Sequence, residues 1–129
     1  MKNKIDLAVR LLLGLPFLVF GLNGFLHFIP MPEPSPAAGA FFGALIKTGY
    51  FLPVLNILEI VSGALLLSGF FVPLALTILA PIVVHIFLFH IFLDISGIGL
   101  AVAVLIMEVY LVYVYKNNFK SLLANKLDE

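Results

Sequence analysis

The sequence contains no cysteine. This absence excludes disulfides, thiolate metal sites, cysteine-ligated iron–sulfur clusters and thiol–disulfide exchange by this chain. Any redox role would therefore need a bound cofactor. The sequence also has no Walker loop, no nucleophile elbow, no HExxH motif and no dinucleotide-binding fingerprint.

Charge is scarce as well. The 129 residues include seven basic and seven acidic side chains, whereas 63% of the residues are hydrophobic. This number of charges is too small to cover the surface of a soluble domain of this size. The composition therefore predicts a single-domain integral membrane protein in a lipid bilayer. The net charge of zero gives no support for a nucleic-acid partner.

Long apolar runs are what the sequence does contain. A helix needs about 20 apolar residues to cross a hydrocarbon core of about 30 Å, and four stretches are long enough: residues 5–29, 51–69, 72–93 and 97–115. They do not alternate as barrel strands do, and lipid offers their backbone no hydrogen-bond partner, so they are predicted to be helices. The short connections "SGFFVP" and "DISG" predict antiparallel neighbours. We therefore expect an all-α fold, a four-helix antiparallel transmembrane bundle.

Three further predictions concern the segment after the first run, the first run itself and the orientation of the chain. Residues 36–48 are too short to cross and are predicted to form an interfacial helix after the prolines of "PMPEPSP". The first run begins like a signal peptide but continues to Ile29 without a small-x-small cleavage site, so we expect a retained helix. Basic residues gather near the chain ends, whereas Lys47 stands alone on the opposite side, which predicts that both termini are cytoplasmic. The basic residues near the ends are Lys2, Lys4, Arg10, Lys116, Lys120 and Lys126.

Polar side chains interrupt the apolar runs mainly in the outer half of the predicted bundle. The set comprises Asn23, His27, Asn56, Glu59, His85, His90, Asp94 and Glu108. Residues four apart share a helix face, as do residues three apart, so Asn23 with His27 and Asn56 with Glu59 are each predicted to point inward. His85 and His90 are about 140° apart around their helix, so only one can face a small site. We expect His85 to point inward and His90 to lie at the rim, where His90 and Asp94 serve as capping residues.

The chemistry of this layer follows from its titratable groups. A carboxylate in the middle of a bilayer costs about 2.5–3.5 kcal/mol, so Glu59 and Glu108 should be protonated or paired. His27 or His85 is the expected partner of Glu59, and a carboxyl beside an imidazole can exchange protons as a proton relay or a quinone site does. The alternative that the polar groups only join helices by hydrogen bonds stays open, above all for Asn23 and Asn56.

Two prosthetic groups are less favoured by the same residues. His27 and His85 would have to supply haem ligands, but the sequence has no attachment motif, and the neighbouring Asn and Glu side chains suit hydrogen bonding better. A metal on Glu59, His27 and His85 would need a geometry that no spacing in the sequence defines. We therefore expect no metal and no haem.

The stretches "FGLNGFLHF", "NILE" and "APIVVHIFLFH" resemble the DoxX family of small membrane proteins, and the resemblance covers essentially the whole chain. It implies a four-helix bundle in the bacterial cytoplasmic (inner) membrane and a distant relation to the membrane subunit of thiosulfate–quinone oxidoreductase. It implies no particular reaction. The family-like polar positions that it marks as a candidate site are Asn23, His27, Asn56, Glu59 and His85.

Two classes of function remain open. In the first, an outer-half pocket binds a quinone or another small amphipathic molecule, with Glu59 and His85 exchanging protons and a partner dehydrogenase supplying electrons. In the second, the chain is a non-enzymatic scaffold, chaperone or accessory subunit for a partner membrane protein, or forms a homo-oligomer. A ligand binder should have a cavity toward the outer leaflet, whereas a scaffold should be a closed bundle. A transporter ranks third, because neither an internal repeat nor broken helices are found.

Overall fold

Helices make up the described part of the chain, residues 3–124 of this computed structural model, in which no strand occurs. The elements are α1 (Lys4–Leu26), α2 (Pro36–Lys47), α3 (Phe51–Ser68), α4 (Val72–Phe92), the short 3-10 helix η1 (Ile95–Gly97), α5 (Ile98–Val114) and a second 3-10 helix, η2 (Lys116–Leu123). Four helical segments are long and apolar enough to cross a membrane: α1, α3, α4, and α5 together with η1. The predicted all-α bundle with a shorter apolar helix after the first span is confirmed.

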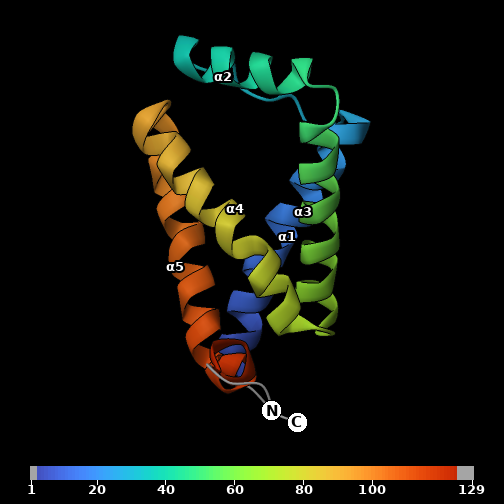
Figure 1. The fold of residues 1–129 in the computed structure, drawn as a ribbon, viewed down its shortest axis with the longest axis vertical. Coiled ribbons are helices and arrows are strands. Elements are labelled where there is room, and N and C mark those ends of the chain that lie inside the picture. Colours follow the sequence, from blue (N-terminus) through green and yellow to red (C-terminus); the bar gives the residue numbers. More distant parts are fainter. Residues whose placement is uncertain (1–2, 125–129) are drawn as a thin grey trace.

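Glycines let α1 and α3 pack closely. A methyl group on Gly63 would collide with the backbone of Leu18 and Gly14, and one on Gly14 would collide with Leu66. The two helix axes can approach because these positions carry no side chain. The pair α1–α3 therefore forms one side of the bundle, while α4 and α5 form the other (Figure 1).

The packed core lies toward the end of the bundle that holds η2. Leu13, Leu66, Leu76, Leu79 and Leu111 are completely buried there. Toward the opposite end, α4 leans away from α1 and α3, and α2 lies across the opening (Figure 1). The fold is thus closed at one end and wider beneath α2.

Contacts with the end of α4 hold α2 in this position. Ser35 accepts a hydrogen bond from the backbone N–H of Ala38 at 3.2 Å and donates one to the carbonyl oxygen of Leu93 at 2.6 Å. The rings of Phe41 and Phe42 pack against Phe89, with centroid distances of 5.9 and 5.1 Å. Ser35 therefore both begins α2 and ties it to α4.

The first helix ends earlier than predicted. It stops at Leu26 instead of Ile29, and His27 follows in the left-handed conformation with φ of 53°. Pro30 disfavours a helical conformation at the residue before it, Ile29. The backbone of Ile29 instead bonds to the side chain of Asn23.

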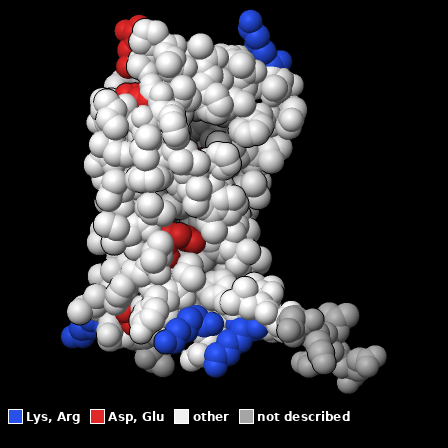
Figure 2. Space-filling model, turned by 60° about the vertical axis from the view of Figure 1, so that its left-hand side comes forward, with Lys and Arg blue, Asp and Glu red and all other residues white. Residues whose placement is uncertain are grey.

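Basic side chains gather at the end of the bundle opposite α2, and a single one projects at the α2 end on the face shown (Figure 2). Among the described residues, Lys47 belongs to α2, whereas Lys4, Arg10, Lys116 and Lys120 belong to α1 and η2. Lys2 and Lys126, which the orientation prediction also uses, lie outside the described residues. The cytoplasmic placement of both termini stays a prediction.

Candidate functional site

Glu59 points into the bundle. It precedes Ser62 and Leu66 by three and seven residues on α3, and both of these side chains are completely buried. Residues at this spacing share one helix face, so the carboxyl of Glu59 faces the interior. Its side chain is only half-buried, because the bundle is wider on the α2 side of the core. Within residues 3–124, its carboxyl has no hydrogen-bond or ion-pair partner.

Asn56 points inward, as predicted, and faces α1. A methyl group on Gly24 would fall on the Asn56 side chain, and one on Gly21 would meet the Asn56 carbonyl oxygen. Gly63, two turns along α3, contacts the same helix. Asn56 and Gly63 therefore form the α1 side of α3, and Glu59 lies between that side and the side toward α4.

Asn23 is 7% exposed and points inward as predicted, but His27 does not share this position. The Asn23 side chain accepts from the Ile29 N–H at 2.7 Å and donates to the Ile29 carbonyl at 3.1 Å. His27 lies just beyond the helix, where its backbone N–H bonds to the Asn23 carbonyl at 2.9 Å and its side chain is exposed. The expectation for His27 was wrong because it assumed that the helix continued through this residue.

The prediction that His85 points inward is wrong, whereas His90 does contact Asp94 at the end of α4, as a capping residue does. His85 is exposed, whereas His90 is half-buried, packs on Gly97 and bonds through Nδ1 to the Asp94 carbonyl at 2.9 Å. Val83 belongs to the buried stripe of α4, and His90 lies seven residues later on the same face. This stripe is the sequence signal that identifies His90 as the inward histidine.

A cavity of about 290 Å³ lies between α3 and α4 in the half of the bundle near α2. Its walls are formed by Tyr50, which precedes α3, by Phe51, Val54, Leu55 and Leu58 of α3, and by Ile82 of α4. Glu59 is not part of this wall, but it follows Leu58 and lies one turn beyond Leu55 on α3. His85 lies one turn along α4 from the wall residue Ile82, but it is exposed and is not itself part of the cavity wall. We call this space the outer cavity.

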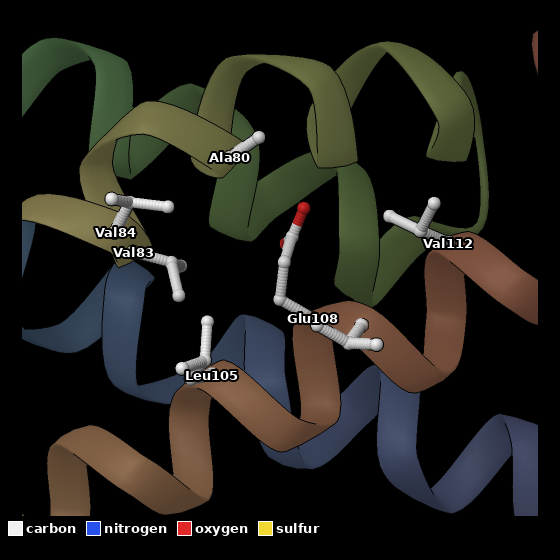
Figure 3. A pocket seen from close by; sticks show the side chains of 7 residues that line it. Ala80, Val83, Val84, Leu105, Glu108 and Val112 are labelled. Atoms are coloured by element: carbon white, nitrogen blue, oxygen red, sulfur yellow. The ribbon is translucent and has the colours of Figure 1, made fainter. Parts of the chain in front are cut away.

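Glu108 lies at a separate place. It is 4% exposed, and among the described residues both of its carboxyl oxygens lack a hydrogen-bond partner. The side chain extends from α5 toward α4 (Figure 3) into a second cavity of about 210 Å³. On α4 this second cavity is lined by Ala80, Val83 and Val84. These residues lie on a different face of α4 from Ile82, which lines the outer cavity. The structure therefore does not place Glu108 at the outer cavity.

Sequence reasoning missed one polar contact across the bundle. The hydroxyl of Tyr110 on α5 donates to the Asp6 carboxylate on α1 at 2.5 Å, and Asp6 is buried. Asp6 also completes a capping box with Asn3 at the start of α1. The Asn-x-x-Asp spacing was a signal for the cap, but no sequence pattern indicated Tyr110 as the partner.

The described residues offer no metal centre. No three His, Cys, Asp or Glu side chains come together there as possible metal ligands. His27 and His85, the residues considered for haem, are both exposed, one after the end of α1 and the other on α4.

The model of the DoxX family matches residues 5–91, about two-thirds of the chain. The chain belongs to the DoxX family. The match covers nearly all of α1 and α4 and the whole of α2 and α3. It therefore includes the five family-like polar positions Asn23, His27, Asn56, Glu59 and His85. It does not extend to α5 and Glu108, although the sequence resemblance was taken to cover essentially the whole chain. No curated protein and no solved structure matches this DoxX-family protein.

Proposed function

We propose that this DoxX-family membrane protein binds a lipid-soluble molecule with a small polar head group, such as a quinone, in the outer cavity. One observation carries the proposal: a cavity lies in the wide half of the bundle, and Glu59, an unpaired carboxyl, is one helical turn along α3 from the wall residue Leu55. This is the feature expected of a ligand binder and not of a closed scaffold. The second class, an accessory subunit or chaperone, is therefore the alternative outcome of the test.

The size of the outer cavity suits one ring. Its volume of about 290 Å³ is close to the lower limit of about 300 Å³ for small-molecule pockets. A cavity of about 150 Å³ already holds benzene, so the outer cavity has room for a substituted six-membered ring. An isoprenoid tail would extend between α3 and α4 into the lipid.

The polar groups around the cavity suit a quinone head. Glu59 on α3 and His85 on α4, each one turn from a wall residue, would contact the ring of a bound quinone, and Asn56 lies one turn from Glu59. Reduction of a quinone to a quinol takes two electrons and two protons. Glu59 and His85 would exchange the protons with the ring oxygens, and a partner dehydrogenase would supply the electrons.

The test is a titration of the purified protein in nanodiscs with menaquinone and ubiquinone analogues. We expect saturable binding that weakens about tenfold in Glu59→Leu and in His85→Ala, because each removes a hydrogen bond to the ring. Leu58→Trp should abolish binding by filling the cavity, whereas Ile57→Trp, a neighbour that is 52% exposed on the lipid side, should not. Unchanged binding in both polar variants, or no saturable binding at all, would overturn the proposal and favour the accessory role.

A further inference from the structure

The cavity around Glu108, which we call the Glu108 groove, is an apolar trough with one polar group inside it. It is lined by Ala80, Val83 and Val84 of α4 and by Leu105, Glu108, Val109 and Val112 of α5. Val84 and Val109 are 47% and 60% exposed, so the groove opens on the outer surface of the bundle, toward lipid. Figure 2 shows acidic residues on the face of the bundle between its two ends, nearer the basic end than the α2 end.

The protein supplies no partner for this carboxyl in the part of the chain that the structure describes. Both oxygens are buried and make no hydrogen bond. Glu108 lies about 15 Å from the start of α5 and about 9 Å from its end, at about 1.5 Å per residue. The described lysines belong to the ends of the bundle. Arg10 lies about 9 Å along α1, at a depth similar to that of Glu108, but its guanidinium packs on Gly69, the residue that ends α3. Polar groups in lipid are normally paired, so the groove lacks a complementary group.

We propose that the Glu108 groove binds a lipophilic amine: an ammonium head that pairs with Glu108, carried on an apolar body about the size of one ring. An ammonium has three N–H donors and a carboxylate has two acceptor oxygens, so one amine can satisfy both oxygens, whereas a single hydroxyl donates only one hydrogen bond. The pair is also neutral overall. A neutral amine takes the carboxyl proton in the groove, giving R–NH₃⁺ beside the Glu108 carboxylate, so no net charge crosses the lipid.

The shape of the groove agrees with such a ligand. Its volume of about 210 Å³ exceeds the roughly 150 Å³ of a benzene-binding cavity and is smaller than a drug-sized pocket. The walls other than Glu108 are aliphatic side chains, which suit a ring or a short alkyl body. The site does not depend on the outer cavity, because the two lie on different faces of α4.

The experiment compares two probes of nearly equal size, 4-phenylbutylamine and 4-phenylbutanol, on the full-length protein in phosphatidylcholine nanodiscs, with empty nanodiscs as the background. We expect saturable binding of the amine and weaker binding of the alcohol. Glu108→Gln keeps the side-chain shape but removes the charge, and should weaken amine binding about thirtyfold or more, as loss of one partner of a buried charge pair does. Ala80→Phe should block both probes by filling the groove.

The matched control is Glu59→Gln, which removes the other intramembrane carboxyl and should leave amine binding unchanged. Equal binding of amine and alcohol, or an equal loss in the Glu59 and Glu108 variants, would overturn the proposal. Native mass spectrometry of the same samples provides a further check. A dimer that disappears in Glu108→Gln while the amine fails to bind would assign the groove to a helix–helix contact, and would also overturn the proposal.

Discussion

Asn23 shows how a polar side chain inside a membrane protein can find its hydrogen-bond partners in a nearby segment of the same chain. Its amide bonds to both the N–H and the carbonyl of Ile29, which close the chain over the end of α1. Those two backbone groups follow a helix end and would otherwise be unpaired. Asn23 therefore has a structural role here, whereas both carboxyl oxygens of Glu108 are buried without a partner among the described residues.

The first prediction concerns this cap. Asn23→Ala should destabilise the protein by about 1–3 kcal/mol, because two backbone groups lose their partner. Thermal unfolding in detergent, followed by circular dichroism, measures the change. Asn117→Ala is the control, since Asn117 is exposed, and it should change stability by less than about 0.5 kcal/mol. Equal stability of the two variants would contradict the capping role.

The direction of a polar side chain could be predicted where its neighbours on the helix define a face. Asn56 faces inward as predicted, and the same reasoning holds for Glu59 beside Ser62 and Leu66. For the two histidines, the angle of about 140° between them was a sound constraint, but the choice of His85 ignored the buried stripe that ends at His90. The role of Asn23 could not be predicted, because its partner Ile29 depends on where α1 ends.

Helix α3 depends on glycine for its contact with α1. Gly63 touches the backbone of the facing helix, where a side chain would push the two helices apart. Gly43 in α2, by contrast, has open space around its Cα. Both glycines lie within helices, but only Gly63 has no room for a side chain.

Alanine substitution at these two glycines should change the free energy of unfolding in opposite directions. Gly63→Ala should destabilise the protein by about 1–3 kcal/mol through overpacking. Gly43→Ala should stabilise it by about 0.5–1 kcal/mol, since alanine is the better helix former and meets no neighbour. Thermal unfolding of both variants is the measurement. A stabilising Gly63→Ala would mean that α1 and α3 are not in close contact.

The position of α2 illustrates what the sequence could not define. Its start at Pro36 was predictable from the Ser-Pro pair, because serine is a good helix cap and proline suits the first turn. Its place across the open end depends on Phe41, Phe42 and Ser35 contacting Phe89 and Leu93, which are far away in the sequence. Such contacts cannot be read from local patterns.

The bundle as a whole is packed at one end and open at the other. The core leucines lie toward η2, whereas the outer cavity lies near α2. Fold class and the number of spans could be predicted from hydrophobic length alone, because a bilayer fixes that length. The uneven packing could not, since it depends on how α4 leans relative to α3.

Orientation in the membrane can be tested directly because the sequence has no cysteine. Lys47→Cys in α2 and Ser121→Cys in η2 each introduce a single thiol at an exposed position. In intact bacterial spheroplasts, a membrane-impermeant maleimide should label the first variant and not the second. Permeabilisation should then expose the second. The reverse pattern would contradict the prediction from the basic residues that both termini are cytoplasmic.

The most direct test of the central claim is to locate a bound quinone by photo-crosslinking. An azidoquinone analogue is irradiated with the protein in nanodiscs, and the labelled peptides are identified by mass spectrometry. The account predicts labelling within residues 50–58 of α3 and around Ile82 of α4, which excess unlabelled quinone and Leu58→Trp both prevent. Labelling spread over the lipid-facing residues of every helix, or confined to α5 around Glu108, would contradict it.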